Sequence, residues 1–248
     1  MKINQCNKVF VYISNLGSNN ADCFFMPEKR KCEVNSCNNA DVKNQKEEVW
    51  SLLCLALKKS YGIDASQISF KKTANGKWIS DKCCFSLSHS NNILVAAVSK
   101  TPVGVDVEKI DGKRMTERLA KRILTDKESN IFFNTAKEKR TQLLADAWTT
   151  KESIFKLKGE KDFCPNLIPA IKIKKRLFKF KTGSNKSNAK ILKQKSFSLK
   201  NLQNIVKVKT INVSAKDKVF SLSVATQQNK SIIYRFLGNT YYAKKRYR

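Results

Sequence analysis

Two carboxylates lie two positions apart in a valine-rich run of the chain. Asp106 and Glu108 alternate with Val105 and Val107, a pattern that predicts a β-strand from Val103 to Ile110. Side chains at alternate positions of a strand leave the same face, so both carboxylates project together and the valines form an apolar face. Neighbouring carboxylates repel unless a cation lies between them. The pair is therefore a candidate for binding a hard divalent cation, although Asp-x-Glu alone also occurs on solvated strands.

A second motif runs from Trp148 to Lys156 in a helix-like segment. Glu152 and Lys156 are four positions apart, which places them one helical turn apart on the same side. The alternative to a functional motif is an ordinary amphipathic helix, with Trp148 in the core and Lys151 and Glu152 as surface charges. Together the two motifs supply three carboxylates and a lysine, groups that can hold Mg²⁺ on a phosphate while a proton moves nearby.

The one histidine, His89, lies in the polar segment Ser88–Asn92 directly after a predicted strand. A single histidine is more often structural than catalytic. A turn rich in serine and asparagine nevertheless suits a phosphate, because Ser88 and backbone N–H groups can donate to it.

The chain is very basic. Its 248 residues hold 49 Lys+Arg against 20 Asp+Glu, a formal net charge of +29. Such a field attracts polyanions, including nucleic acid, a membrane surface, a phosphate-rich cofactor or an acidic protein. A general drift of composition toward lysine and asparagine is the explanation that we favour for much of the excess. Because no run approaches ~20 apolar residues, we expect no membrane-spanning helix.

The eight cysteines form no C-x-x-C pair, so the usual zinc and redox spacings are absent. The start of the chain carries no apolar run of signal-peptide length. We therefore expect reduced thiols and a cytoplasmic protein.

Periodicity and turn residues predict the elements that position these motifs. Expected strands cover 8–13, 68–72, 84–87, 94–98, 103–110, 171–173, 196–199, 206–211 and 219–225. Expected helices cover 49–61, 114–124 and 140–158, with a further helix starting at the capping-box pattern of 125–128 and loops at 35–45 and 181–190. Phe85–Ser88 recurs as Phe220–Ser223, a faint echo that hints at two similar halves.

The order Ser88-His89-Ser90, Gly-Val-Asp-Val-Glu, Trp-Thr-x-Lys-Glu-x-x-x-Lys resembles the 4'-phosphopantetheinyl transferases of the surfactin-synthetase-activating type, over most of residues 8–175. The resemblance implies a monomeric α+β fold of two similar α/β halves in a pseudo-twofold arrangement, with the coenzyme A site between them. We assign 1–102 to the N-terminal half, 103–228 to the C-terminal half with the metal site, and 229–248 to a basic C-terminal tail.

The resemblance also implies roles for individual residues. Asp106, Glu108 and Glu152 match the ligands of Mg²⁺, or of Mn²⁺ in its place, and the catalytic set is Glu152, Lys156 and His89. Contacts with coenzyme A are implied at Lys29, Lys31, Lys46, Gly76, Lys77, Ser88, His89 and Lys156. Lys43 is an alternative to Lys46, and Trp78 stands where the family has a proline after Gly-Lys.

The implied reaction transfers 4'-phosphopantetheine from coenzyme A to a serine of an acyl or peptidyl carrier protein and releases adenosine 3',5'-bisphosphate. Either Glu152 or a metal-bound water accepts the serine proton, and the sequence leaves both open. Two other classes remain: a basic nucleic-acid-binding protein, and a Mg²⁺-dependent nuclease or other phosphoryl transferase. Neither a membrane nor a nucleic acid is the expected partner.

Overall fold

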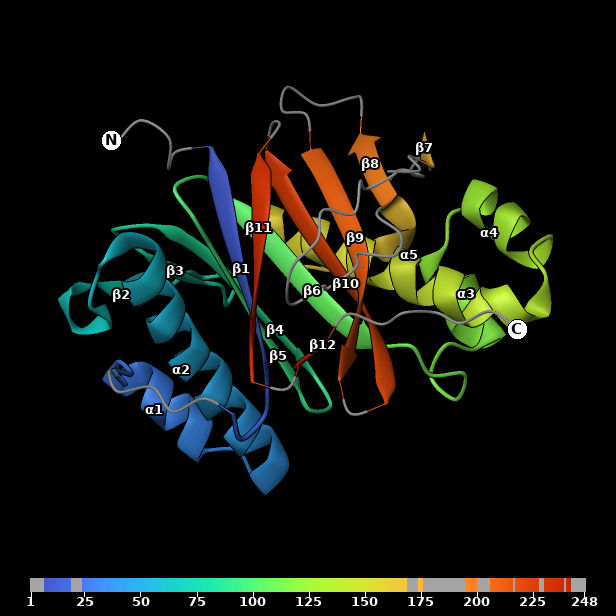
Figure 1. Cartoon of the computed structure of the whole chain (residues 1–248). Coiled ribbons are helices and arrows are strands. Elements are labelled where there is room, and N and C mark those ends of the chain that lie inside the picture. Colours follow the sequence, from blue (N-terminus) through green and yellow to red (C-terminus); the bar gives the residue numbers. More distant parts are fainter. Residues whose placement is uncertain are drawn as a thin grey trace, which may run out of the picture.

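The computed structural model describes residues 7–18, 24–168, 174–175, 195–199, 206–215, 217–227, 230–238 and 240–241. The fold is mixed α+β (Figure 1). Two sheets pack on each other through an apolar core, and each carries a long helix on its outer side. None of the helices in these residues is long and apolar enough to cross a membrane.

The first sheet contains the first strand and one of the last. Its order is β11-β1-β5-β4, with β1 (Lys8–Asn15), β4 (Cys84–Ser90), β5 (Ile93–Ser99) and β11 (Ser231–Leu237). β11 lies parallel to β1, whereas β1, β5 and β4 pair antiparallel. The sequence assigns residues 231–237 to the tail and misses this strand, because pairing with β1 is a contact across almost the whole chain.

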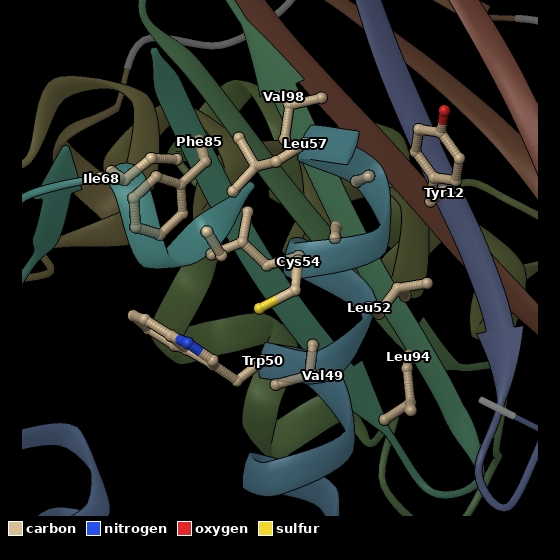
Figure 2. Packing of buried hydrophobic residues seen from close by; sticks show 14 of the residues in the cluster. Tyr12, Val49, Trp50, Leu52, Cys54, Leu57, Ile68, Phe85, Leu94 and Val98 are labelled. Carbon is tan, nitrogen blue, oxygen red and sulfur yellow. The ribbon is translucent and has the colours of Figure 1, made fainter. Parts of the chain in front are cut away.

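α2 (Ala40–Tyr61) packs on the outer face of the first sheet, where Trp50, Leu52 and Leu57 are buried (Figure 2). Asn39 caps the start of α2 by accepting a hydrogen bond from the Val42 N–H, so the predicted loop of 35–45 is wrong beyond residue 39. The end of α2 agrees with the sequence, since Gly62 adopts φ 69° at its C-terminus.

Four short elements lie around α2 or follow it in the chain. α1 (Glu28–Asn35), which the sequence does not predict, lies against α2. η1 (Ala65–Gln67) follows α2, and β2 (Phe70–Lys72) pairs with β3 (Trp78–Ser80) across the predicted Asn75-Gly76 turn. The edges of Phe70, Trp78 and Phe85 contact the Trp50 ring, which fixes the hairpin on α2.

The second sheet follows the order β6-β10-β9-β8-β7, with β12 also paired to β9. Its strands are β6 (Val103–Lys109), β7 (Lys174–Lys175), β8 (Lys195–Leu199), β9 (Val206–Ala215), β10 (Lys218–Gln227) and β12 (Thr240–Tyr241). Alternate residues of β6, β9 and β10 face the first sheet and are apolar, as the valines of β6 predict. The predicted 171–173 strand and 181–190 loop lie outside the described residues.

α5 (Lys137–Lys158) covers the other face of the second sheet and ends at Gly159, as predicted. α3 (Glu117–Ile123), α4 (Asp126–Phe133) and η2 (Pro165–Leu167) surround it. The predicted capping box is confirmed, since Thr125 and Glu128 bond reciprocally at the start of α4. Lys151, which is fully buried, donates to Glu128 at 2.6 Å and so ties α4 to α5.

Candidate functional site

The two sheets meet at a seam between their edge strands β4 and β6, and serine side chains bridge it. Three serines of β4 accept hydrogen bonds from alternate N–H groups of β6: Ser86 from Val105 at 3.0 Å, Ser88 from Val107 at 3.2 Å and Ser90 from Lys109 at 3.1 Å. The serines are buried. The predicted turn at Ser88–Asn92 is therefore wrong, because β4 continues to Ser90 and only Asn91 and Asn92 remain between it and β5.

Asp106 lies at the centre of this seam and is only 6% exposed. Its Oδ1 accepts a hydrogen bond from Ser88 Oγ at 2.8 Å and from Lys156 Nζ at 2.7 Å. Its Oδ2 is buried and has no hydrogen-bond partner among the described residues. An unpaired buried carboxylate oxygen is costly unless a cation lies against it, so Asp106 has a free coordination position.

Glu108 occupies the next position on the same face of β6. Its Oε1 accepts hydrogen bonds from Ser90 Oγ at 3.0 Å and from the Arg114 guanidinium at 2.6 Å. Burial raises the pKa of the Glu108 carboxyl, an effect that the Arg114 charge opposes. The sequence predicts neither Ser90 nor Arg114 at the site. Reading Ser88–Ser90 as a strand would have placed Ser90 beside Ser88 on one face.

Glu152 faces the same cluster from α5, one turn before Lys156. Burial raises the pKa of Glu152 to about 7, and the negative charges of Asp106 and Glu108 add to this effect while Lys156 opposes it. Both β6 carboxylates and Lys156 therefore act electrostatically on Glu152.

The chemistry of this donor set fits a hard divalent cation. Carboxylate oxygens are the ligands that Mg²⁺ and Ca²⁺ prefer, and one of them, Asp106 Oδ2, is buried without a partner. Within the described residues, no group of three His, Cys, Asp or Glu side chains is already gathered as a metal-binding cluster. Lys156 and Arg114 instead donate to the carboxylates.

His89 alternates with Ser88 on β4, so its side chain leaves the opposite face of the strand. Burial lowers the pKa of His89, and the positive charges of Lys156, Lys46 and Arg30 lower it further. The negative charge of Asp106 opposes this lowering. Lys156 lies on α5, whereas Lys46 and Arg30 lie on α2 and α1, so positive charges from both sets of elements act on His89.

In the basic segment of α1, the structure turns Arg30 inward rather than Lys29 or Lys31, the two residues that the sequence predicts as contacts with coenzyme A. Lys29 and Lys31 are exposed, whereas the side chain of Arg30 is only 13% exposed. Arg30 stacks over the Trp50 ring at 5.3 Å and pairs with Glu33 at 3.3 Å. The period of a helix would have separated Arg30 from Lys29 and Lys31. The sequence does not predict a helix over residues 28–35, however, because the apolar pattern of this segment is weak.

The remaining residues that the sequence predicts for the site are Lys46, Gly76 and Lys77. Lys46 Nζ donates to Cys37 Sγ at 2.9 Å. Gly76 adopts φ 81° in the β2–β3 turn. The Lys77 ammonium donates to the backbone carbonyl of Lys156, at the C-terminal end of α5, rather than pointing toward the carboxylates.

The pKa of Glu152 predicts a pH-dependent stability in the absence of metal. A folded pKa near 7 lies above the ordinary 4.5, so the folded chain binds more protons than the unfolded chain between these values. The contribution of Glu152 is therefore fully present below pH 4.5 and is lost as pH rises through 7. In thermal melts with a chelator, wild type should lose Tm relative to Glu152→Gln across this window. Glu160→Gln, at an exposed carboxylate, should show no such trend, and parallel curves for wild type and Glu152→Gln would contradict the assignment.

Comparison with known proteins gives a consistent similarity. Residues 102–195 match the family model of the 4'-phosphopantetheinyl transferase superfamily. The chain is 33% identical over 112 residues to the 4'-phosphopantetheinyl transferase of Bacillus subtilis, which covers 44% of this chain and 49% of that protein. It is 29% identical over 128 residues to the 4'-phosphopantetheinyl transferase gsp of Aneurinibacillus migulanus, covering 49% and 53%. Its identity to the 4'-phosphopantetheinyl transferase HetI of Nostoc sp. is 29% over 106 residues, covering 40% and 45%. The chain spans about half the length of the curated relatives it matches.

Proposed function

We propose that this chain is a 4'-phosphopantetheinyl transferase, because residues 102–195 match the family model of that superfamily. The proposed reaction moves 4'-phosphopantetheine from coenzyme A to a serine of an apo acyl or peptidyl carrier protein. Adenosine 3',5'-bisphosphate is released. A hydroxyl attacks a diphosphate here, so the site has to bind phosphate charge and accept one proton.

The charged groups around β4 are the observation that carries this proposal. Asp106 and Lys156 are in contact. In addition to burial, the positive charges of Lys156 on α5 and of Lys46 and Arg30 on α2 and α1 all lower the pKa of His89 on β4. Coenzyme A carries a diphosphate and a separate 3'-phosphate, and in this proposal Lys156 binds the first while Arg30 and Lys46 bind the second.

We propose that Asp106, Glu108 and Glu152 hold Mg²⁺, or Mn²⁺ in its place. The buried Asp106 Oδ2, which has no partner among the described residues, supports this assignment. Such an ion, when bound, would neutralise the charge that develops on the diphosphate.

The protein's own groups account for the remaining steps. Lys156 donates to the phosphate that is transferred, and His89 donates to the same diphosphate. The carrier serine Oγ forms a bond to the pantetheine-bearing phosphorus, the bond from that phosphorus to the adenylate oxygen breaks, and the Oγ proton passes to the Glu152 carboxylate. The two roles of Glu152 compete, because a carboxylate on a metal ion is less basic.

The helices and strands that supply these charged groups lie on both sides of the proposed division at residue 102. α1, α2 and β4 supply Arg30, Lys46, Ser88 and His89, whereas β6 and α5 supply the carboxylates and Lys156. We propose that residues 1–102 and 103–228 are two halves related by a pseudo-twofold axis, with coenzyme A between them. Residues 229–248 follow the second half in this division, and β11 within them returns to the first sheet.

Lys46 is proposed to contact the 3'-phosphate, which predicts a selective effect of its removal. A charge-assisted contact is worth ~1.5–3 kcal/mol, or roughly 10- to 100-fold in binding. Lys46→Met should therefore raise KM for coenzyme A by about tenfold or more and leave KM for dephospho-coenzyme A nearly unchanged. Lys59→Met, which removes the same charge from an exposed position near the other end of α2, should alter neither constant. Equal losses for both substrates in Lys46→Met would remove this role.

Ser90 is proposed to orient Glu108 for the metal, and Ser86 provides a matched control. Each accepts a hydrogen bond from a β6 N–H, but of the two only Ser90 also donates to a carboxylate. Both alanine variants should lose about 1–3 kcal/mol of unfolding free energy through the unpaired N–H. Ser90→Ala should in addition require about tenfold more Mg²⁺ for half-maximal activity. Equal Mg²⁺ requirements in the two variants would contradict this role of Ser90.

The proposed function is tested by incubating an apo carrier protein with the chain, coenzyme A and Mg²⁺, and measuring the intact mass of the carrier. A gain of one phosphopantetheine supports the transferase. An unmodified carrier together with tight RNA binding at physiological salt would favour the nucleic-acid alternative instead.

A further inference from the structure

The turn between β2 and β3 is fixed internally and reaches the C-terminal end of α5. The Thr73 N–H donates to the Lys77 carbonyl at 2.8 Å, and the Lys77 N–H donates to Thr73 Oγ1 at 3.1 Å. Gly76 supplies the left-handed conformation that closes this turn, with φ 81°. The turn therefore presents Asn75 and Lys77 in a defined orientation.

Both side chains bind carbonyl groups that end α5. Lys77 Nζ donates to the carbonyl of Lys156 at 2.5 Å and approaches that of Leu157 at 3.5 Å. Asn75 Nδ2 donates to the carbonyl of Gly159 at 3.0 Å. The last carbonyls of a helix lack partners within the helix and carry its negative end, so a cation and an amide donor stabilise them.

The fit around Lys77 is close. A side chain at Gly159 would approach Lys77 Cδ to 3.2 Å, and Gly159 itself has φ 68°. Burial lowers the pKa of the Lys77 ammonium, in keeping with its position between the hairpin and α5. Two carbonyls of α5 thus lie within reach of the Lys77 ammonium, which directs this side chain to the end of the helix.

We propose that Lys77, with Asn75, is a positioning residue that fixes the end of α5 and thereby the Lys156 side chain. This inference rests on the proposed function, in which Lys156 donates to the transferred phosphate. The link is direct, because Lys77 binds the backbone of Lys156 and the Lys156 ammonium lies 2.7 Å from Asp106. A helix end that frays would move Lys156 from that position.

The inference predicts a particular division of kinetic effects. Displacing a catalytic group by about 1 Å can lower a rate up to ~100-fold, so Lys77→Met should lower kcat about tenfold. KM for coenzyme A should change less than about twofold, because Lys77 does not bind the cofactor. Asn75→Ala, at an exposed residue with one bond to α5, should lower kcat in the same direction by a smaller factor. Lys71→Met removes the same charge from an exposed position of the hairpin and should match wild type.

The test combines steady-state kinetics with amide hydrogen exchange of α5 in the full chain. Faster exchange in residues 155–159 of Lys77→Met, a lower kcat and an unchanged KM are expected. A raised KM with unchanged kcat and unchanged exchange would overturn the inference and assign Lys77 to the cofactor. If wild type itself fails to modify a carrier, the proposed function fails, while hydrogen exchange still reports whether Lys77 fixes the end of α5.

Discussion

Replacing Asp106 with alanine is expected to lower the rate of carrier modification by about 10²- to 10³-fold while the chain remains folded. A metal ion contributes several kcal/mol to stabilising developing charge, and ~1.4 kcal/mol corresponds to tenfold in rate. Asp106 also holds Lys156, so its loss affects two groups that act on the phosphate. The fold should survive, because the substitution removes a buried, partly unpaired carboxylate rather than apolar packing.

Asp162→Asn is the matched control, since it removes the same charge from an exposed loop after α5. Turnover within about twofold of wild type is expected for this variant, as is usual for surface changes. Wild-type turnover in Asp106→Ala at limiting Mg²⁺ would remove Asp106 from the proposed metal site. Circular dichroism and thermal melts of both variants separate lost activity from lost structure.

Gly104→Ala is expected to abolish the stable packing of α5 on β6. A Cβ at this position would lie 1.9 Å from the Ser153 carbonyl oxygen and 2.5 Å from the Leu157 N. Both are backbone atoms of α5, so neither can turn away as a flexible side chain would. Overpacking costs typically 1–3 kcal/mol even where side chains can move, so a clash with a rigid helix should exceed that.

Gly112→Ala provides the comparison for this effect. Its Cβ would meet Thr141 Oγ1 at 3.9 Å, an ordinary contact distance. The melting temperature of Gly112→Ala should stay close to that of wild type, whereas Gly104→Ala should yield little folded protein. A Gly104→Ala variant that melts near wild type would mean that α5 does not approach β6 this closely.

Within each motif, the relative positions of the carboxylates and Lys156 could be predicted, because they depend on spacing along a single strand or helix. Asp106 and Glu108 share a face of β6, and Glu152 and Lys156 lie one turn apart on α5, as the periods of a strand and a helix require. The ends of α2 and α5 were predictable for the same reason, since Gly62 and Gly159 stop them.

The strand at Ser88–Ser90 and the inward position of Arg30 were not predicted, because both depend on packing contacts. The run Ser88–Ser90 is polar enough to suggest a turn, yet it is a buried strand because β6 supplies hydrogen bonds to its serines. Arg30 could not be distinguished from its exposed lysine neighbours until Trp50 and Glu33 defined the inner side of α1. These partners are distant in sequence or belong to a helix with a weak apolar pattern.

The most direct test of the transferase is the intact mass of an apo carrier protein after incubation with the chain, coenzyme A and Mg²⁺. The Bacillus subtilis relative serves as the positive control in the same assay, so that a misfolded or unreactive carrier is recognised. We predict a gain of one phosphopantetheine on the carrier serine. The gain should disappear with a serine-to-alanine carrier, with a chelator and with Asp106→Ala. An unchanged carrier mass with folded wild-type chain, under conditions in which the relative completes the reaction, would contradict the account.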